Sequence, residues 1–320
     1  MVMAEAVVVS NWEHGRSAVE TAIRILKNGG STIDAVERGI MTVEDDLNVD
    51  SVGNGGMPNI EGVLELDASL MEGISFRAGA VTGLRLIRNP ISAARKVMEI
   101  CPHVMLSGEG ALRFARAVGL EETNGLTPES ILKWKKLKSE VLNYSNYDEM
   151  AAKFRRELGY DTNLKSLIDG IMMMTRAGQL KANSTVGVLS VDDSSIVAGT
   201  STSGWALRLP GRVADSSVIG AGTYATPSGA SSSTGQGEYS IKHNLTRKVC
   251  DLLELGLSPT EACEETLKNM LKKEKVDVIM ALIAVDKRGN IGGATTKKGF
   301  CYYYRRLSEE RTTRVVPSPV

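Results

Sequence analysis

Two spacings of apolar residues run through the chain, and they predict a mixture of helices and strands. Where apolar positions recur every three or four residues, the period is that of a helix with one buried face; alternating positions or short apolar runs are typical of strands. The expected helices lie at 16–28, 31–43, 91–100, 108–118, 240–255 and 258–272. The expected strands lie at 1–10, 62–72, 78–84, 185–191, 196–202, 276–285, 291–296 and 299–305.

Residues at the ends of these stretches support several of the predicted elements. Ser31 followed by Asp34 is a helix-start signal, and Ser258-Pro259 places proline at the first position of another helix. The run at 276–296 turns back on itself, which favours antiparallel pairing. Because each sheet and each helix must bury one face, we expect two stacked, mainly antiparallel sheets between layers of helices, an α+β fold.

Four other stretches have weaker patterns. Residues 51–59 form a glycine-rich loop, and 121–165 are charged and polar, which indicates surface helices and loop rather than a nucleic-acid patch because acidic residues are interleaved. Residues 164–176 contain three successive methionines and are expected to form a packed or flexible helix rather than a cofactor-binding segment. We expect residues 312–320 to be a loose tail.

Composition adds few constraints. The chain has 320 residues, compatible with one catalytic domain over 1–320, and its 38 Lys and Arg balance its 38 Asp and Glu. That balance gives no general attraction to nucleic acid or membranes. No stretch has the length of a membrane span, and the start of the chain lacks a signal peptide's basic flank, so a cytoplasmic location is expected. The four cysteines form no CxxC pair and the three histidines have no zinc spacing, so free thiols and no metal are predicted.

A long segment from residue 199 to 237 is dense in glycine, serine and threonine. It cannot form a packed core of its own, which leaves three interpretations. Phosphate binding is disfavoured, because there is no GxxxxGK[ST] and 220–226 only weakly matches GxGxxG. The turns could also be purely structural. The favoured interpretation is a hydrolase site in which hydroxyl groups and backbone N–H groups converge.

A hydroxyl nucleophile in such a site needs a base, and no Ser-His-Asp arrangement is evident. Thr185 stands at the start of a predicted strand. If the peptide bond between Ser184 and Thr185 were cut, the new α-amine would supply that base, a pairing known for activated nucleophiles. An α-amine titrates at about 7.7–8.0, which suits a base at neutral pH.

Motifs spread over nearly the whole chain resemble the glycosylasparaginases (aspartylglucosaminidases) and the related plant-type asparaginases, which are N-terminal nucleophile hydrolases. They are Val8–Trp12, Gly29–Glu37, Ser51–Gly56, Glu65–Ala68, Gly79–Val81, Ala94–Val97, Thr185–Gly187, Gly199–Thr202, Gly211–Ser216, Gly220–Ala225 and Thr234–Gly237. The resemblance implies a four-layer αββα sandwich and self-cleavage before Thr185, giving an α chain of residues 1–184 and a β chain of 185–320. It also implies hydrolysis of an amide bond in an aspartate-like small molecule, no cofactor, and a homodimer of the cleaved units.

The same resemblance implies roles for individual residues. Thr185 would be the nucleophile and, through its freed amine, the base, and Thr202 would hydrogen-bond the nucleophile. Arg212 would bind the substrate α-carboxylate, and Asp215 would bind the substrate α-ammonium group. Thr234 and Gly235 would form the oxyanion hole, and Trp12 would line the pocket. Taken alone, Arg212 and Asp215 could be a surface ion pair, Thr234 a turn residue and Trp12 a core residue.

One departure from the glycosylasparaginase pattern concerns the cleavage site. Those enzymes usually have His-Asp before the threonine, whereas this chain has Asn183-Ser184. The plant-type relatives also lack that aspartate, so its absence is compatible with self-cleavage. Three functions therefore stay open. N4-(β-N-acetylglucosaminyl)-L-asparaginase activity is favoured by Trp12 and 51–56, L-asparaginase or isoaspartyl peptidase activity uses the same site, and a non-catalytic, uncut binding protein is the third.

Overall fold

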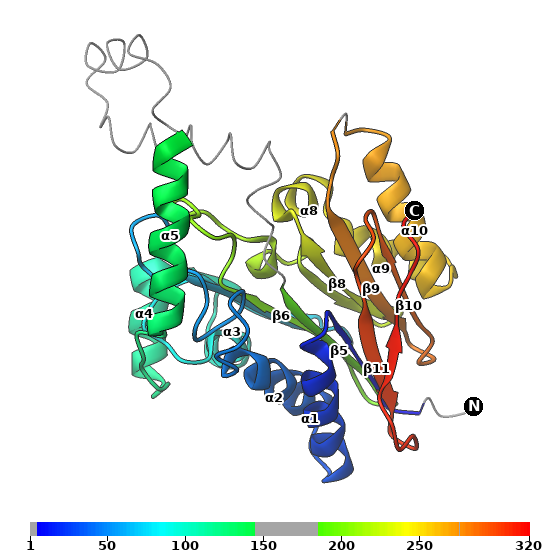
Figure 1. Cartoon of the computed structure of the whole chain (residues 1–320). Helices are drawn as coiled ribbons and strands as arrows, with labels where there is room; N and C mark the ends of the chain where they lie inside the picture. The colour runs from blue at the N-terminus through cyan, green and yellow to red at the C-terminus, as the bar shows by residue number, and fades with distance from the viewer. Residues whose placement is uncertain (1–4, 145–184, 275) are drawn as a thin grey trace.

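The computed structural model describes residues 5–144, 185–274 and 276–320, which form two sheets and the helices packed on them (Figure 1). The strands are β1 (Val7–Asn11), β2 (Leu66–Glu72), β3 (Arg77–Leu84), β4 (Met105–Ser107), β5 (Val186–Val191), β6 (Ile196–Thr202), β7 (Thr223–Thr226), β8 (Gly229–Gly235), β9 (Met280–Asp286), β10 (Ile291–Thr295), β11 (Tyr302–Arg306) and β12 (Thr313–Val315). The helices are α1 (Gly15–Lys27), α2 (Thr32–Glu44), α3 (Pro90–Ile100), α4 (Gly108–Ala117), α5 (Pro128–Tyr144), the short 3₁₀ helix η1 (Asp215–Ser217), α8 (Gly237–His243), α9 (Leu245–Glu254) and α10 (Pro259–Leu271).

The eight-stranded sheet has the order β12-β11-β1-β5-β6-β2-β3-β4, and the four-stranded sheet the order β10-β9-β8-β7. Neighbouring strands pair antiparallel except β3 and β4, as the hairpin pattern predicts. In this register Val186 lies opposite Ser201, and Asp67 lies opposite Thr202. The start of β5, the end of β6 and the start of β2 therefore lie side by side at the same end of these three neighbouring strands.

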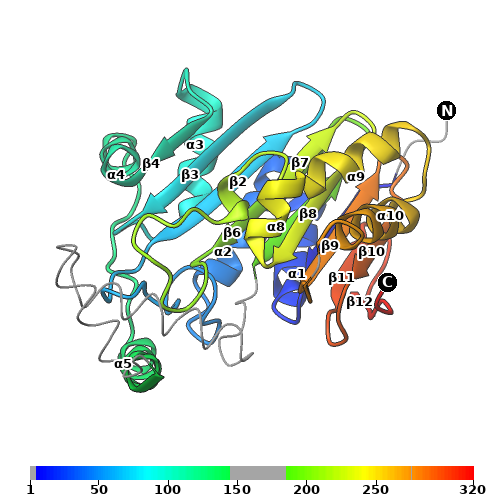
Figure 2. The same ribbon diagram turned by 90° about the horizontal axis from the view of Figure 1, so that it is seen from above.

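Three apolar clusters hold these elements together. In the first, α1, α2 and α3 pack on one face of the large sheet. The second lies between the sheets, where β5 and β6 contact β7, β8 and β9. In the third, α9 and α10 cover the other face of the small sheet, with α9 along β7 and β8 (Figure 2).

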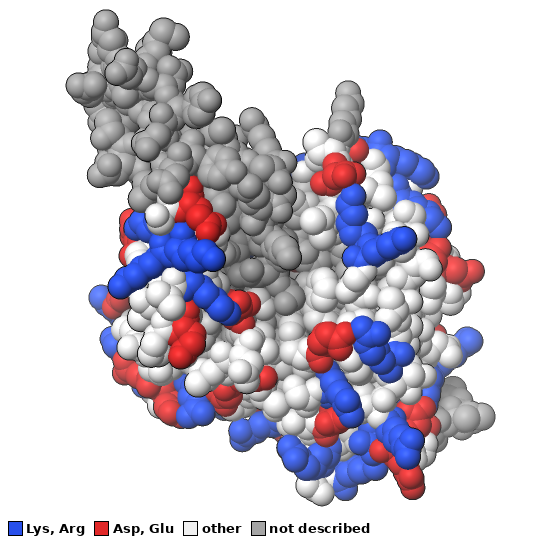
Figure 3. Space-filling model, in the orientation of Figure 1, with Lys and Arg blue, Asp and Glu red and all other residues white. Residues whose placement is uncertain are grey.

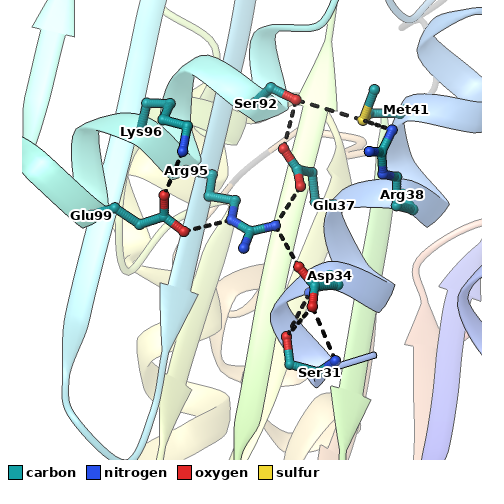
Figure 4. Close-up of polar contacts among 9 residues, drawn as sticks. All are labelled: Ser31, Asp34, Glu37, Arg38, Met41, Ser92, Arg95, Lys96 and Glu99. Carbon is teal, nitrogen blue, oxygen red and sulfur yellow. Dashed lines mark hydrogen bonds and ion pairs between the residues drawn. The ribbon is translucent and has the colours of Figure 1, made fainter. Parts of the chain in front are cut away.

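An ion-pair cluster joins α2 to α3. The guanidinium of Arg95 on α3 reaches Asp34 (2.8 Å) and Glu37 (2.5 Å) on α2 and Glu99 one turn along α3 (2.6 Å; Figure 4). The Ser31 capping box at the start of α2 uses the same Asp34 carboxylate, as the sequence predicts. This network fixes the two helices against the large sheet.

Most of the predicted elements are confirmed within a few residues, but two expectations were wrong and two strand regions were missed. Residues 240–255 are two helices separated by Asn244, whose left-handed φ of 51° interrupts the helix. Residues 312–320 are not a loose tail, since β12 pairs with β11 and Pro319 bridges to Thr295. The short strand β4 was missed.

The largest correction concerns β7 and β8, which the sequence pattern did not predict. β8 reads GASSSTG and is buried along almost its whole length. A Cβ on Gly187 of β5 would lie 2.0 Å from Ser232 Oγ, so the two sheets touch here through atoms no larger than a hydroxymethyl group. The small residues that look like loop in the sequence allow this close approach. The helix expected at 164–176, part of 121–165, and Ser184 lie outside the described residues.

Candidate active site

The hydroxyl-rich segments converge where β5 begins and where β6 and β8 end. Thr185 directly precedes β5 and is only 4% exposed, and its backbone N–H donates to Thr234 Oγ1 at 3.2 Å. Trp12 donates its indole Nε1–H to the same oxygen at 2.8 Å. Thr234 Oγ1 therefore accepts two hydrogen bonds, which leaves its own proton free to be donated elsewhere.

The backbone around Trp12 is unusual. Its φ is 61°, a left-handed conformation that costs energy for a bulky residue. The surroundings compensate, because Trp12 N donates to Cys301 O at 2.8 Å and the indole packs edge-on against Phe300 at 5.2 Å between ring centroids. This conformation aims the indole N–H at Thr234.

Thr202 ends β6, and its hydroxyl contacts the glycine-rich loop. Thr202 Oγ1 donates to Ser51 O at 3.2 Å and accepts from Gly204 N at 3.0 Å. Ser203 N donates to the same Ser51 carbonyl at 2.9 Å. The expected hydrogen bond between Thr202 and Thr185 stays a prediction.

The loop itself is anchored on Glu44, the last residue of α2. Asn54 N donates to Glu44 O at 2.8 Å, and Gly53 has a φ of 58° with space for no side chain, since its Cβ would lie 2.3 Å from Glu44 O. The Glu44 carboxyl group is fully buried and accepts from Ile91 N at 3.0 Å and Asn89 Nδ2 at 3.1 Å. Burial raises the pKa of this carboxyl group to about 8, against the effect of those hydrogen bonds.

Asp215 opens η1 and is 3% exposed, with Ser233 Oγ donating to its Oδ2 at 2.7 Å. Burial raises the pKa of Asp215 to about 6, although the Ser233 hydrogen bond and the charge of Arg212 act in the opposite direction. Arg212 donates through Nε and Nη2 to Glu238 Oε1 at 3.0 and 2.8 Å. The ion pair of Arg212 is thus with Glu238, a residue that the sequence analysis missed.

Gly235 ends β8 in a conformation that only glycine adopts easily. Its φ is 124°, and a Cβ there would lie 2.2 Å from Ile279 O. The residue follows Thr234, so the Gly235 N–H and the Thr234 hydroxyl are neighbours on one short stretch of backbone. Such adjacent donors suit an oxyanion.

His14 is a second neighbour of Thr185 that the sequence analysis did not place in the site. Burial lowers the pKa of His14 to about 4, partly offset by a hydrogen bond with the Thr185 backbone. The imidazole is therefore neutral near pH 7, and its low pKa makes it a weak base.

The described residues contain no group of three or more His, Cys, Asp or Glu side chains that could hold a metal ion. Within the same part of the chain, no helix is long and apolar enough to cross a membrane. The four cysteines are free thiols, as predicted. Basic and acidic side chains are interspersed on the face shown in Figure 3, including the outer side of α5.

Comparison with known proteins gives a consistent result. The family model described as asparaginase matches residues 3–315. A plant-type L-asparaginase from Pyrococcus horikoshii is 39% identical over 277 residues, covering 87% of this chain and 84% of that protein. An N(4)-(beta-N-acetylglucosaminyl)-L-asparaginase from Elizabethkingia miricola is 35% identical over 302 residues, covering 92% and 79%. An isoaspartyl peptidase/L-asparaginase from Danio rerio is 35% identical over 276 residues, covering 86% and 79%.

Proposed function

This chain belongs to the asparaginase family, and from that premise we propose that it hydrolyses the side-chain amide of aspartyl substrates with an N-terminal threonine. The observation that carries the proposal is the contact of Thr185 N with Thr234 Oγ1 at 3.2 Å. It brings Thr185, the nucleophile and base of this proposal, within reach of Thr234, its oxyanion donor. We further propose that the two sheets and their helices form the αββα sandwich of such hydrolases.

The active form is produced by cleavage between Ser184 and Thr185. The hydroxyl of Thr185 attacks the preceding carbonyl carbon, the nitrogen of Thr185 leaves as an amine, and water hydrolyses the resulting ester. The products are residues 1–184 and a second chain that begins at Thr185. The weak basicity of His14 supports this route, because the freed amine is then the base best matched to neutral pH.

In hydrolysis, the Thr185 amine takes the proton of the Thr185 hydroxyl while the oxygen attacks the amide carbon. The carbonyl oxygen becomes an oxyanion, to which Thr234 Oγ–H and Gly235 N–H donate. The protonated amine then gives its proton to the departing nitrogen. A water molecule, deprotonated by the same amine, hydrolyses the acyl-enzyme and releases aspartate.

Two charged groups of the site would recognise the free aspartyl end. Arg212 presents a planar guanidinium for the α-carboxylate and has to exchange its hydrogen bonds with Glu238 for the substrate. Asp215 is buried and receives the α-ammonium. Both roles require substrates whose α-groups are free, which excludes aspartyl residues inside a peptide.

The leaving group distinguishes two candidate activities. N4-(β-N-acetylglucosaminyl)-L-asparagine is the first candidate, because Trp12 and the 51–56 loop resemble the glycosylasparaginases. L-asparagine, with β-aspartyl peptides beside it, is the second, since the four plant-type L-asparaginases compared are 37–39% identical to this chain.

The test compares turnover of the glycosylated asparagine, L-asparagine and a β-aspartyl dipeptide by the purified, matured protein. We expect the highest kcat/KM for the glycosylated asparagine. A higher kcat/KM for L-asparagine would select the second candidate, and failure to hydrolyse any of the three by a cleaved protein would refute the proposed function.

A further inference from the structure

The carboxyl group of Asp215 is held from two sides by residues outside the predicted site. Ser233 Oγ donates to Oδ2 at 2.7 Å. On the other side, Gly237 leaves the space that Oδ1 occupies, since a Cβ at Gly237 would lie 2.4 Å from that oxygen. One orientation of the carboxyl group is therefore fixed by packing and by a single hydroxyl group.

Ser233 is itself part of a buried chain of hydroxyl groups. Ser240 Oγ on α8 lies 3.1 Å from Ser233 Oγ, and both hydroxyls lie within donating distance of Ala221 O, at 2.8 Å for Ser240 and 3.0 Å for Ser233. Both serines are fully buried. Each hydroxyl has one proton and two acceptors within reach.

This chain of hydroxyls can satisfy Asp215 in either charge state. When Asp215 is ionised, Ser233 donates to it and Ser240 donates to Ala221 O. When Asp215 is protonated, it donates to Ser233, and both serines can donate to the two lone pairs of that carbonyl. No buried hydroxyl loses its partner in either state, so the ionised carboxylate gains a charge-assisted hydrogen bond without a compensating loss elsewhere.

We propose that Ser233 is a positioning residue for the substrate's α-ammonium group: acting through Asp215 and supported by Ser240, it keeps that carboxyl group ionised and correctly oriented. The inference rests on the proposed function, in which Asp215 binds the ammonium.

The other charges near Asp215 do not replace Ser233. Among the described residues, Arg212 favours the ionised form and Glu238 disfavours it. These two side chains are paired with each other at 2.8 Å, so their opposed effects partly cancel. Burial, the largest influence, favours the protonated form, and the Ser233 hydrogen bond is the strongest influence that acts against it, ahead of the Asp215 backbone.

The experiment compares two competitive inhibitors, L-aspartate and succinate, which share both carboxylates and differ in the ammonium group. Inhibition constants are measured at pH 6, 7 and 8 against whichever amide the matured protein hydrolyses. The variants are Ser233→Ala, Ser240→Ala and the matched control Ser231→Ala, whose buried hydroxyl lies two residues earlier on β8 and donates to Ile283 O at 2.9 Å.

Loss of a hydrogen bond to a charged group should raise the pKa of Asp215 by about one unit. From a starting value of about 6, Ser233→Ala should weaken L-aspartate by about five-fold at pH 6 and about two-fold at pH 7, with no difference at pH 8. Succinate should be unaffected at each pH. Ser240→Ala should give a smaller change in the same direction, and Ser231→Ala none.

The outcomes separate the inference from the proposed function. If unmodified protein binds L-aspartate and succinate equally at every pH, Asp215 does not bind an ammonium group, and both the inference and the proposed function are overturned. If it prefers L-aspartate but Ser233→Ala weakens both inhibitors alike, or weakens L-aspartate equally at pH 6 and 8, Ser233 is structural and the inference alone is overturned. Should Ser233→Ala fail to fold or mature, Ser240→Ala decides: an unchanged inhibition constant for L-aspartate at pH 6 overturns the inference.

Discussion

At the scale of single residues, the site depends on the oxygen atom of one hydroxyl group. Thr234 Oγ1 accepts from the Trp12 indole and from Thr185 N, residues that lie 222 and 49 positions away in the chain. Two donors on one hydroxyl oxygen orient the remaining proton away from both of them. The geometry thus couples Trp12, the proposed wall of the pocket, to Thr234, the proposed oxyanion donor.

Trp12→Phe tests this coupling. Phenylalanine can keep the edge-on contact with Phe300 but has no indole N–H, so the Thr234 hydroxyl loses one restraint. We expect kcat to fall about ten-fold, the equivalent of one hydrogen bond, with a smaller change in KM. Steady-state kinetics of the matured variant measure both, and an unchanged kcat would show that Trp12 only lines the pocket.

Asp215→Asn should separate activity from stability. The folded pKa of Asp215 lies above its ordinary value of 3.8, at about 6, so the folded chain binds this proton more tightly than the unfolded chain. The stability of the unmodified protein therefore falls as pH rises from about 4 to about 6, by up to roughly 3 kcal/mol. Asparagine cannot ionise and should avoid this loss.

The measurement is thermal unfolding of Asp215→Asn and its parent at pH 4 and pH 7.5, both in an uncut Thr185→Ala background. The variant's advantage in Tm should be larger at pH 7.5, while in the maturing protein the same change should abolish most activity. A variant that is less stable than its parent at pH 7.5 would contradict the account.

The sequence analysis predicted Thr185, Arg212 and Asp215 as site residues, but not the side chains that contact Arg212 and Asp215 in the structure. Thr185, Arg212 and Asp215 stand in motifs that identify the family. Glu238 precedes the helix predicted at 240–255, and Ser233 lies in the glycine-, serine- and threonine-rich segment for which no strand was predicted. Their hydrogen bonds with Arg212 and Asp215 become visible only in the folded structure.

At the scale of elements, α2 supports the end of β6 that carries Thr202 through its last residue, Glu44. The Glu44 carbonyl holds the glycine loop and the Glu44 carboxyl group holds the start of α3. The sequence predicted α2 and the loop as separate features. It did not predict β8 because small polar residues have low strand propensity, and only the close approach of two sheets selects them.

Glu44→Gln tests this support. The pKa of Glu44 is raised from 4.5 to about 8 by burial, so the folded protein favours the neutral acid and loses stability as pH rises from about 4.5 to about 8. Glutamine keeps the shape and stays neutral. We expect near-normal activity at pH 7, and at pH 9 a higher Tm and better retained activity than in the unmodified protein. Equal alkaline losses in both proteins would rule out Glu44 as the cause.

At the scale of the whole molecule, the two fragments expected from cleavage are interleaved in one sheet. β1 from residues 1–184 pairs with β5 and β11, and β2 pairs with β6, so the order of strands alternates between the fragments. A cut before Thr185 would not divide the molecule into two separable halves. The family motifs predict where the cut would lie, whereas the strand order that would hold the fragments together needed the structure.

The fragments should therefore stay together after maturation. We expect 1–184 and 185–320 to co-elute in size-exclusion chromatography without denaturant and to separate only after unfolding. The apparent mass of the complex also tests the homodimer that the family resemblance implies. Elution of either fragment alone under native conditions would be incompatible with the interleaved sheet.

The central claim is that the working enzyme begins a chain at Thr185. N-terminal sequencing of catalytically active protein, combined with intact mass spectrometry, tests it directly. The account predicts a second N-terminus at Thr185 in all active preparations and an uncut, inactive chain in Thr185→Ala. Active protein with a single N-terminus at Met1 or Val2 would contradict it.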